Sequence, residues 1–265
     1  MRLRLTIRPS HAQTSIPLSY EYYLSAAIYQ WIELSSPEFS DFLHNKGYST
    51  ETLKRSFKHF CFSQLFIEHA CVVGEEIHIN GGNILWYIGM PIEESLQHLV
   101  AGLFEWRECF IGREENKFSI EQVETLPDPI WTQRMKFRTL SPVTVSVPEE
   151  RNGKLTPRYL KADDPQLSES LRLNVLHRYE SLYGELPSDT EFCCTTDAEY
   201  IARRGGADRV SKLVTIKKGL PEETKVRGFR CPVTLEGSVE LIKLSYDSGL
   251  GEKGSMGFGM LEVTT

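Results

Sequence analysis

The sequence predicts an α+β fold made of two tandem ferredoxin-like (RNA-recognition-motif-like) domains. The chain has 265 residues, 40% of them hydrophobic, which is enough for two domains of ordinary size, each with its own core. In the first half, hydrophobic patterns follow the order strand–helix–strand–strand–helix–strand. A proline-bearing segment then precedes a second half in which the same order loosely returns.

The first domain is expected over residues 1–125. Apolar and polar side chains alternate over residues 3–8, which indicates its opening strand. An apolar stripe at helical spacing predicts a helix over 19–34. A second, short helix is expected to begin at Ser36-Pro37, because proline favours the first helical position. The remaining elements are strands over 60–67, 84–90 and 117–125, and a helix over 91–104.

Residues 126–134, "LPDPIWTQR", are expected to form a linker because they contain two prolines. The second domain is expected over residues 135–265. Its strands are expected over 135–147, 191–196, 208–216, 226–235 and 256–263, and its helices over 165–184 and 238–249. No sequence repeat relates the two halves, so the duplication is inferred from the order of elements alone.

Composition excludes several classes of protein. No apolar run approaches the length of a membrane span, and the opening residues lack the apolar core of a signal peptide. The six cysteines form no CxxC pair, so we expect reduced thiols in a cytoplasm. Together with the histidines they show no metal-ligand spacing, and we expect neither a metal nor a cofactor.

Charge is distributed unevenly along the chain. The net charge is −6, but residues 201–230 carry nine Lys and Arg against three Asp and Glu, a local charge of +6. Salt limits the reach of each charge to about 8–10 Å, so a local patch matters more than the total. This segment is either a solvated hairpin or a surface that follows a phosphate backbone.

The stretch "GLGEKGSMGFGMLEV" (249–263) holds five glycines in eleven residues. It contains GxGxxG, but a strand is expected after it, so a dinucleotide site is rejected. It matches the ribonucleoprotein pattern of RNA-recognition motifs only in part, since Met256 and Val263 replace a cation and an aromatic residue. Two interpretations remain: a turn that packs closely on a neighbour, and a loop whose N–H groups surround a phosphate.

Five stretches, spread over nearly the whole chain, carry a resemblance to a known family. They are "IPLSYEYYLSAAIYQWI", "SPEFSDFLHNKGY", "FKHFCFSQLF", "LSPVTV" and the glycine-rich stretch. The glycine-rich stretch between the last helix and the last strand resembles the signature of the repeat-associated mysterious proteins of CRISPR systems. Within that superfamily, the chain is similar to the endoribonuclease that cuts the CRISPR precursor RNA inside each repeat.

The resemblance implies a catalytic set on the first domain: Tyr29, His44 and Lys58. Such an enzyme needs no metal, because the 2′-hydroxyl of the RNA attacks the adjacent phosphate and leaves 2′,3′-cyclic phosphate and 5′-hydroxyl ends. A histidine, with a free pKa near ~6.5, suits the proton transfer, as base or as acid. Tyrosine is a poor base, so Tyr29 is expected to orient the 2′-hydroxyl or the phosphate, and Lys58 to stabilise the developing charge.

Other residues compete for two of these roles. Lys46, Lys54 and Arg55 could each reach the same phosphate in place of Lys58. His59 could replace His44 in proton transfer, although its place within an expected strand favours a packed histidine.

The expected partner is CRISPR repeat RNA, with a CRISPR interference complex as a further partner; monomer and homodimer both stay open. The basic segment would hold the repeat stem or its flank, and the glycine-rich stretch the strand near the cut. The alternatives are a non-catalytic RNA-binding subunit of a CRISPR effector complex and a general RNA-binding protein. The expected RNA-binding residues are Arg203, Arg204, Arg209, Lys217, Lys218, Gly249, Gly251, Lys253, Gly254, Gly257 and Gly259.

Overall fold

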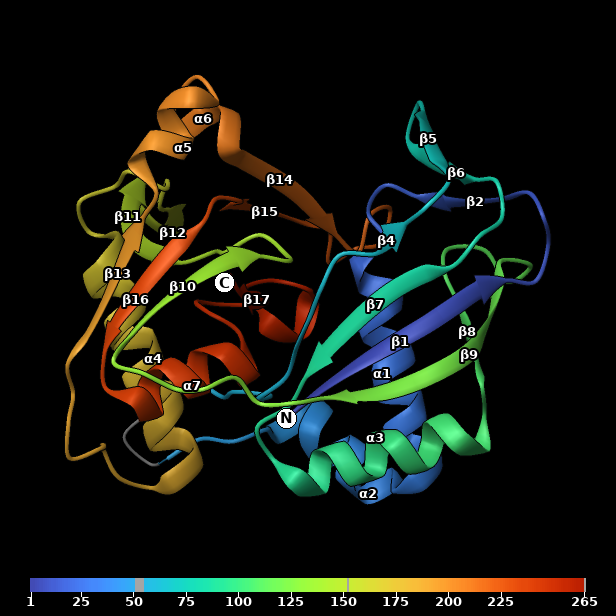
Figure 1. Cartoon of the computed structure of the whole chain (residues 1–265), viewed down its shortest axis with the longest axis horizontal. Helices are drawn as coiled ribbons and strands as arrows, with labels where there is room; N and C mark the ends of the chain where they lie inside the picture. The colour runs from blue at the N-terminus through green and yellow to red at the C-terminus, as the bar shows by residue number, and fades with distance from the viewer. Residues whose placement is uncertain (51–54, 152, 265) are drawn as a thin grey trace.

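A computed structural model gives the fold of the chain and describes residues 1–50, 55–151 and 153–264. It is a mixed α+β fold in which two antiparallel sheets lie side by side, each packed against its own helices (Figure 1). No described helix is long and apolar enough to cross a membrane.

The first sheet runs in the order β3-β7-β1-β9-β8, and β4 pairs with β7 beside β3. Leu3, Leu5 and Ile7 of β1 point to one face and are fully buried, as the alternation predicts. The bounds of its strands are β1 Arg2–Pro9, β3 Cys61–Phe62, β4 Phe66–Ile67, β7 Ile84–Gly89, β8 Glu108–Phe110 and β9 Lys117–Leu126.

Helices α1 (Glu21–Ser35) and α3 (Glu93–Glu105) cover the buried face of this sheet and contribute to a single core around Trp31 and Trp86. The two helices touch at Gly102, where an added Cβ would lie 1.7 Å from the carbonyl oxygen of Trp31. Only glycine permits that approach. The short helix α2 (Pro37–Asp41) follows α1 and continues into a π-helical turn, η1 (Phe42–Lys46).

The second sheet runs in the order β13-β16-β10-β17 and has a separate core, shared with helices α4 (Leu167–Tyr183) and α7 (Val239–Ser248). Its strands are β10 Arg134–Thr139, β13 Phe192–Thr196, β16 Val233–Gly237 and β17 Leu261–Val263. Four strands of the first sheet, β3-β7-β1-β9, and the four of the second, β13-β16-β10-β17, share one order. Numbered along the chain within each set of four, that order is second, third, first, fourth.

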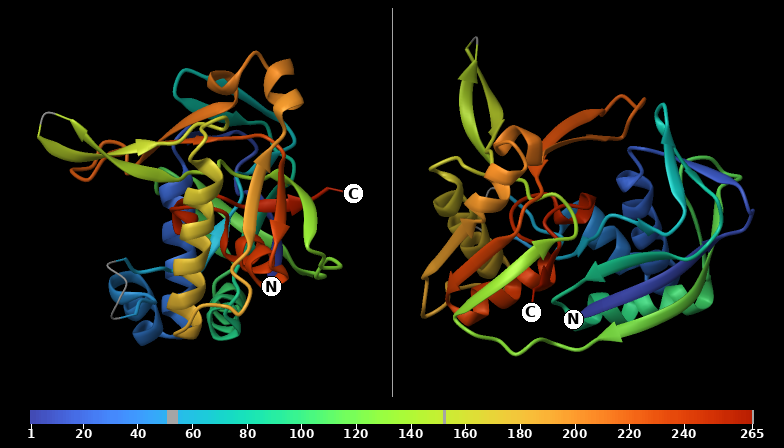
Figure 2. Two further views of the ribbon diagram at one scale, coloured as in Figure 1. Left: turned by 90° about the vertical axis from the view of Figure 1, so that its left-hand side faces the viewer. Right: turned by 45° about the horizontal axis from the view of Figure 1, so that its top comes forward.

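Each half also contains smaller sheets. A three-stranded sheet belongs to the first half, and the hairpin β11–β12 projects from the body of the second (Figure 2). A second hairpin, β14–β15, follows the short helices α5 and α6. The bounds are β2 Thr14–Pro17, β5 Ala70–Val73, β6 Glu76–Ile79, β11 Ser146–Arg151, β12 Lys154–Tyr159, α5 Ala198–Arg203, α6 Ala207–Val210, β14 Ser211–Ile216 and β15 Thr224–Phe229.

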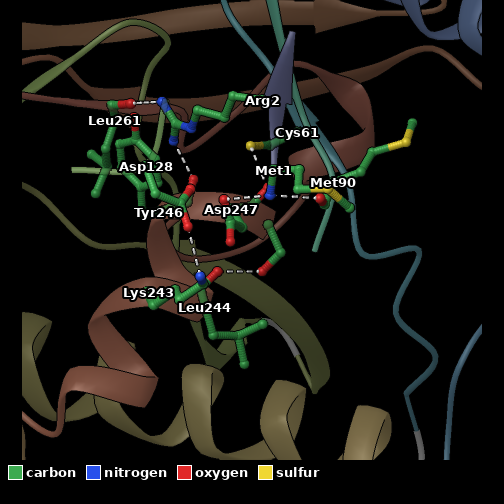
Figure 3. Close-up of polar contacts among 11 residues, drawn as sticks. Met1, Arg2, Cys61, Met90, Asp128, Lys243, Leu244, Tyr246, Asp247 and Leu261 are labelled. Atoms are coloured by element: carbon green, nitrogen blue, oxygen red, sulfur yellow. Dashed lines mark hydrogen bonds and ion pairs between the residues drawn. The ribbon is translucent and has the colours of Figure 1, made fainter. Parts of the chain in front are cut away.

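Polar contacts join β1 of the first sheet to α7 and β17 of the second half (Figure 3). The buried guanidinium of Arg2 lies 3.2 Å from the centre of the Tyr246 ring and donates hydrogen bonds to the carbonyls of Tyr246 and Leu261. Burial lowers the pKa of Arg2. The amino group of Met1 lies 3.0 Å from the carboxylate of Asp247. These contacts hold the two sheets in one arrangement.

The structure corrects three expected strands of the second half. Residues 208–216 begin as the helix α6 and are extended only from Ser211 onward. Residues 226–235 divide into β15 and β16 near Pro232, which has no N–H to donate to a ladder. The last strand is short because the preceding residues form the 3₁₀ turn η2 (Gly254–Met256) and two glycines of positive φ.

Candidate active site

The structure brings together the three residues of the expected catalytic set, which come from three separate segments. Tyr29 lies on α1, His44 in the turn η1, and Lys58 in the segment before β3. The rings of Tyr29 and His44 meet edge to face, with their centres 5.2 Å apart. The Lys58 ammonium donates to the carbonyl oxygen of His44 at 2.8 Å. A phenol, an imidazole and an amine therefore surround one small region of the surface.

The position of His44 follows from local sequence signals. Ser36 caps α2 by accepting a hydrogen bond from the backbone of Phe39 at 3.2 Å, as expected for a helix that begins at Ser36-Pro37. The helix widens into the π turn, which closes where the N–H of Gly47 donates to the carbonyl of Phe42 at 2.7 Å. Such wide turns are frequent at functional sites. Leu43 is buried, so the adjacent His44 faces solvent.

Tyr29 is half-buried, and its ring also contacts that of Phe60, with centres 5.6 Å apart. Burial raises the pKa of Tyr29 well above its ordinary value of 10. The phenol is therefore neutral near pH 7 and can donate a hydrogen bond, which agrees with an orienting role and opposes a role as base.

Lys58 is the lysine that contacts His44 in the structure. Burial lowers its pKa from the ordinary value of 10.5. Among its competitors, Arg55 pairs with Glu252 at 2.9 Å, Lys46 is exposed on the turn η1, and Lys54 lies outside the described residues. One of the three ammonium protons of Lys58 is used by the carbonyl of His44, which leaves two for a phosphate.

His59 is packed between the two halves. The Ser181 hydroxyl donates to the carbonyl of Arg178 at 2.8 Å, so its oxygen accepts from Nε2 of His59 at 2.9 Å. Burial, with a smaller contribution from the positive charge of Arg178, lowers the pKa of His59 to about 3. The neutral, enclosed imidazole supports the interpretation of His59 as a packed residue.

The five glycines of the glycine-rich stretch are all buried. Four of them, Gly249, Gly251, Gly257 and Gly259, have positive φ values between 76° and 91°. Several N–H groups of this stretch donate to backbone carbonyls, for example Gly259 to Pro142 at 2.8 Å. The observed role of these glycines is therefore close packing, and their direct contact with an anion stays a prediction. Lys253, by contrast, is exposed.

A buried arginine, absent from the residues expected at the site, holds this stretch. Arg178 of α4 donates to the carbonyls of Ser248 and Gly251 and, at 2.9 Å, to the Ser248 hydroxyl. Burial lowers its pKa to about 10. In the sequence it lies in a largely polar helix with several other charged residues, so no pattern distinguishes it.

A cavity of about 480 Å³ joins Lys58 to the glycine-rich stretch. Its lining includes the cations Arg55, Lys58, Arg178 and Lys253 and the carboxylate of Glu252. A predominance of cations around a cavity is suited to a phosphate. Among the residues that the structure describes, no three His, Cys, Asp or Glu side chains could together hold a metal ion.

The expected basic residues of the second half fall into separate places. Arg204 and Arg209 line a second cavity of about 420 Å³, together with Arg138, Lys212 and Arg230 and beside the ring of Tyr200. Arg203 is exposed at the end of α5, outside this lining.

The two lysines at the tip of β14–β15 face the first half instead. Lys217 lies 5.8 Å from the centre of the Tyr22 ring, and Lys218 pairs with Glu75 at 2.5 Å. The basic segment therefore forms a cation-lined cavity at one end and a contact with the first half at the other.

Two models of one protein family match the chain. Residues 15–124 match the family model described as "CRISPR-associated protein Cas6, N-terminal", and residues 124–263 match "CRISPR associated protein Cas6, C-terminal". The chain is 29% identical over 261 residues to "CRISPR-associated endoribonuclease Cas6 1" of Methanocaldococcus jannaschii, covering 98% of this chain and 92% of the relative. It is 26% identical to "CRISPR-associated endoribonuclease Cas6" of Pyrococcus furiosus, covering 98% and 88%.

A solved structure described as "Characterization of a Cas6-related gene from Pyrococcus furiosus" has a TM-score of 0.83 and 24% identity, and the match covers 100% of this chain and 98% of that one. This likeness shows a shared fold. The relatives from M. jannaschii and P. furiosus are both named as endoribonucleases, which is the enzyme class predicted from the sequence. Because the two family models together match residues 15–263, the chain belongs to the Cas6 family of CRISPR-associated proteins.

Proposed function

We propose that the protein is a metal-independent endoribonuclease that cuts CRISPR repeat RNA and releases guide RNAs with 2′,3′-cyclic phosphate and 5′-hydroxyl ends. The observation that carries this proposal is the convergence of Tyr29, His44 and Lys58 beside a cation-lined cavity. Membership of the Cas6 family, with relatives named as endoribonucleases, supports the same activity.

In the proposed reaction, the 2′-oxygen forms a bond to phosphorus as the bond from phosphorus to the 5′-oxygen breaks. One proton leaves the 2′-hydroxyl and one reaches the departing 5′-oxygen. His44 performs one of these two transfers, and water serves for the other. The phenol of Tyr29 donates a hydrogen bond that orients the ribose or the phosphate. The free N–H groups of Lys58 stabilise the negative charge that grows on the phosphate oxygens.

We further propose that the chain consists of two tandem ferredoxin-like domains, over 1–125 and 135–265, with 126–134 as linker. Two features support this division. Each half has its own hydrophobic core, and the principal strands of both sheets follow the same order. In the linker, Asp128 pairs with Lys243 of α7 at 2.9 Å.

The proposed RNA path runs from the active site to the second half. Lys253 lies at the cavity beside Lys58, and the cavity lined by Arg204 and Arg209 offers a second place for phosphates. We expect the paired replacement of Arg204 and Arg209 by glutamine to weaken RNA binding. It should also lower the salt dependence of binding, by about 0.7–0.9 in log–log slope for each phosphate that the variant no longer neutralises. Arg172→Gln, outside this path, is the control.

Unchanged affinity and an unchanged salt slope in the paired variant would remove the second cavity from the RNA path. The affinity and salt slope of a variant in which Lys217 and Lys218 are replaced test whether RNA displaces these lysines from their contacts with Tyr22 and Glu75.

The activity is tested with cognate repeat RNA in excess EDTA, followed by the same RNA with a 2′-deoxy sugar at the cleaved position. We expect cutting to persist in the chelator and to stop with the deoxy sugar, because that sugar lacks the attacking hydroxyl. Cutting that needs a divalent metal, or that continues with the deoxy sugar, would contradict the proposed reaction. Tight binding without any cutting would instead indicate a non-catalytic RNA-binding subunit of a CRISPR effector complex.

A further inference from the structure

A chain of hydrogen bonds leads from His44 to a carboxylate at the end of α2. Nδ1 of His44 lies 3.0 Å from Oδ1 of Asn45, and Nδ2 of Asn45 donates to Oδ1 of Asp41 at 2.6 Å. All three side chains are exposed. Neither Asn45 nor Asp41 belongs to the expected catalytic set.

The direction of each bond follows from the chemistry of the groups. An ionised carboxylate can only accept, so the amide of Asn45 must turn its NH₂ toward Asp41. Its oxygen then faces His44, and an amide oxygen can also only accept. Nδ1 of His44 must therefore carry a proton. In the neutral ring the other nitrogen, Nε2, then has the free lone pair.

We propose that Asn45 and Asp41 are positioning residues that hold the proton of His44 on Nδ1, so that Nε2 is the atom that exchanges a proton with the RNA. The assignment applies whether His44 acts as base or as acid, because Nδ1 keeps its proton in both forms. Its catalytic part rests on the proposed function, whereas the tautomer itself does not.

Charged groups of both signs lie around His44. The carboxylate of Asp41 reaches the ring through the amide of Asn45. Two cations lie near it, Lys46 on the same turn and Lys58, whose ammonium donates to the carbonyl of His44. The phenol of Tyr29 on α1 faces the ring as a neutral group. Among these groups, the Asp41–Asn45 pair supplies the acceptor for the N–H of the ring.

The tautomer is measured directly by two-bond ¹⁵N–¹H correlation spectra of protein labelled at histidine, without RNA, at a pH where imidazoles are neutral. The His44 signal is identified by its loss in His44→Ala. We expect Nδ1 to carry the proton in the wild-type protein and Nε2 to carry a larger share in Asn45→Ala, where the acceptor is gone. A wild-type ring protonated at Nε2, or an unchanged tautomer in Asn45→Ala, would overturn the proposal.

Kinetics supply the second test. Asn45→Ala and Asp41→Asn should each slow single-turnover cleavage about three- to tenfold, the range expected for one positioning hydrogen bond, and leave RNA affinity unchanged. Glu38→Gln removes an exposed carboxylate from the same helix and is the charge-matched control, which should cut at the wild-type rate.

The exchanged pair Asp41→Asn/Asn45→Asp keeps the charge but places the carboxylate directly on Nδ1. It should recover the rate lost by the single variants, and the limb of its pH–rate profile that reports His44 should move to higher pH, the acidic limb if His44 is the base and the basic limb if it is the acid. A purely structural role for the pair would leave that limb in place, and this outcome would also overturn the proposal. If His44→Ala itself cuts RNA normally, the proposed role of His44 in the reaction fails, while the spectra still decide the tautomer.

Discussion

Replacing Arg178 with methionine tests how the glycine-rich stretch is held beside the active site. The guanidinium is buried, with 5% of the residue exposed, and donates three hydrogen bonds to Ser248 and Gly251. Methionine fills a similar volume but cannot donate. The two carbonyls and the hydroxyl would then lose their buried donor.

The size of the effect follows from two opposing contributions. Hydrogen bonds from a charged donor contribute about 1.5–3 kcal/mol each, so losing three costs about 6 kcal/mol. Burial lowers the pKa of Arg178 from 12.5 to about 10, and at about 1.4 kcal/mol per pKa unit the desolvation recovered on removing the charge is about 3 kcal/mol. The free energy lost with the hydrogen bonds exceeds the desolvation free energy recovered. We therefore expect Arg178→Met to lower the free energy of unfolding by about 3 kcal/mol.

The assay is urea denaturation followed by tryptophan fluorescence. The control is Arg172→Met on the same helix, where the arginine makes an exposed ion pair with Glu169 at 2.7 Å. Such pairs contribute about 0–1 kcal/mol, so the control should stay close to wild type. If the unfolding free energy of Arg178→Met lies within about 1 kcal/mol of that of Arg172→Met, the buried arginine does not organise the stretch and the reasoning fails.

Three further predictions concern other buried groups. Because the folded protein holds His59 neutral with a pKa of about 3, the unfolded chain binds more protons between pH 3 and ~6.5. The unfolding free energy of the wild-type protein should therefore fall as the pH drops, by about 2 kcal/mol near pH 5. Urea titrations at several pH values should show that His59→Gln lacks this dependence on pH. An equal dependence in both proteins would refute the prediction. Burial raises the pKa of Glu21 to about 7 from 4.5, so the folded state binds more protons between these values and stability falls as the pH rises. Glu21→Gln should be more stable than wild type above pH 7 and equal to it near pH 4, and an advantage that persists at pH 4 would contradict this origin. Gly259→Ala should lower the melting temperature far more than Gly219→Ala. The two glycines have nearly equal φ values, 76° and 78°. A Cβ at Gly259 would lie 2.2 Å from the carbonyl oxygen of Leu250, whereas a Cβ at Gly219 would meet nothing within 4 Å. Equal shifts would show that backbone conformation alone matters.

The main helices could be predicted from the sequence because each has an apolar stripe at helical spacing. The helix expected over 19–34 is α1, Glu21–Ser35, and that expected over 91–104 is α3, Glu93–Glu105. The sheet that contains β5 could not be predicted, because all four residues of Ala70–Val73 are exposed and show no alternation. Exposed strands carry little of the pattern on which such predictions depend.

The candidate site could be predicted in part, and for a different reason. A family resemblance, and no local pattern, points to Tyr29, His44 and Lys58. Their closeness depends on contacts between segments that no periodicity reports. Arg178 and Ser248 are 70 residues apart in the sequence, and their hydrogen bonds leave no local signal. The burial of the glycines likewise depends on long-range contacts, such as those of Gly251 with Thr144 and of Gly257 with Phe62. The sequence therefore leaves close packing and an anion-binding loop both open.

The central claim is that the imidazole of His44 transfers a proton in the cleavage of RNA. The most direct measurement is the single-turnover cleavage rate of His44→Ala on repeat RNA, beside the exposed His69→Ala as control and with binding measured separately on uncleavable 2′-deoxy RNA. We predict a rate lower by about 10²–10⁴-fold with unchanged affinity, the contribution typical of general acid–base catalysis, and a normal rate for the control. A His44→Ala variant that cuts as fast as wild type would contradict this claim.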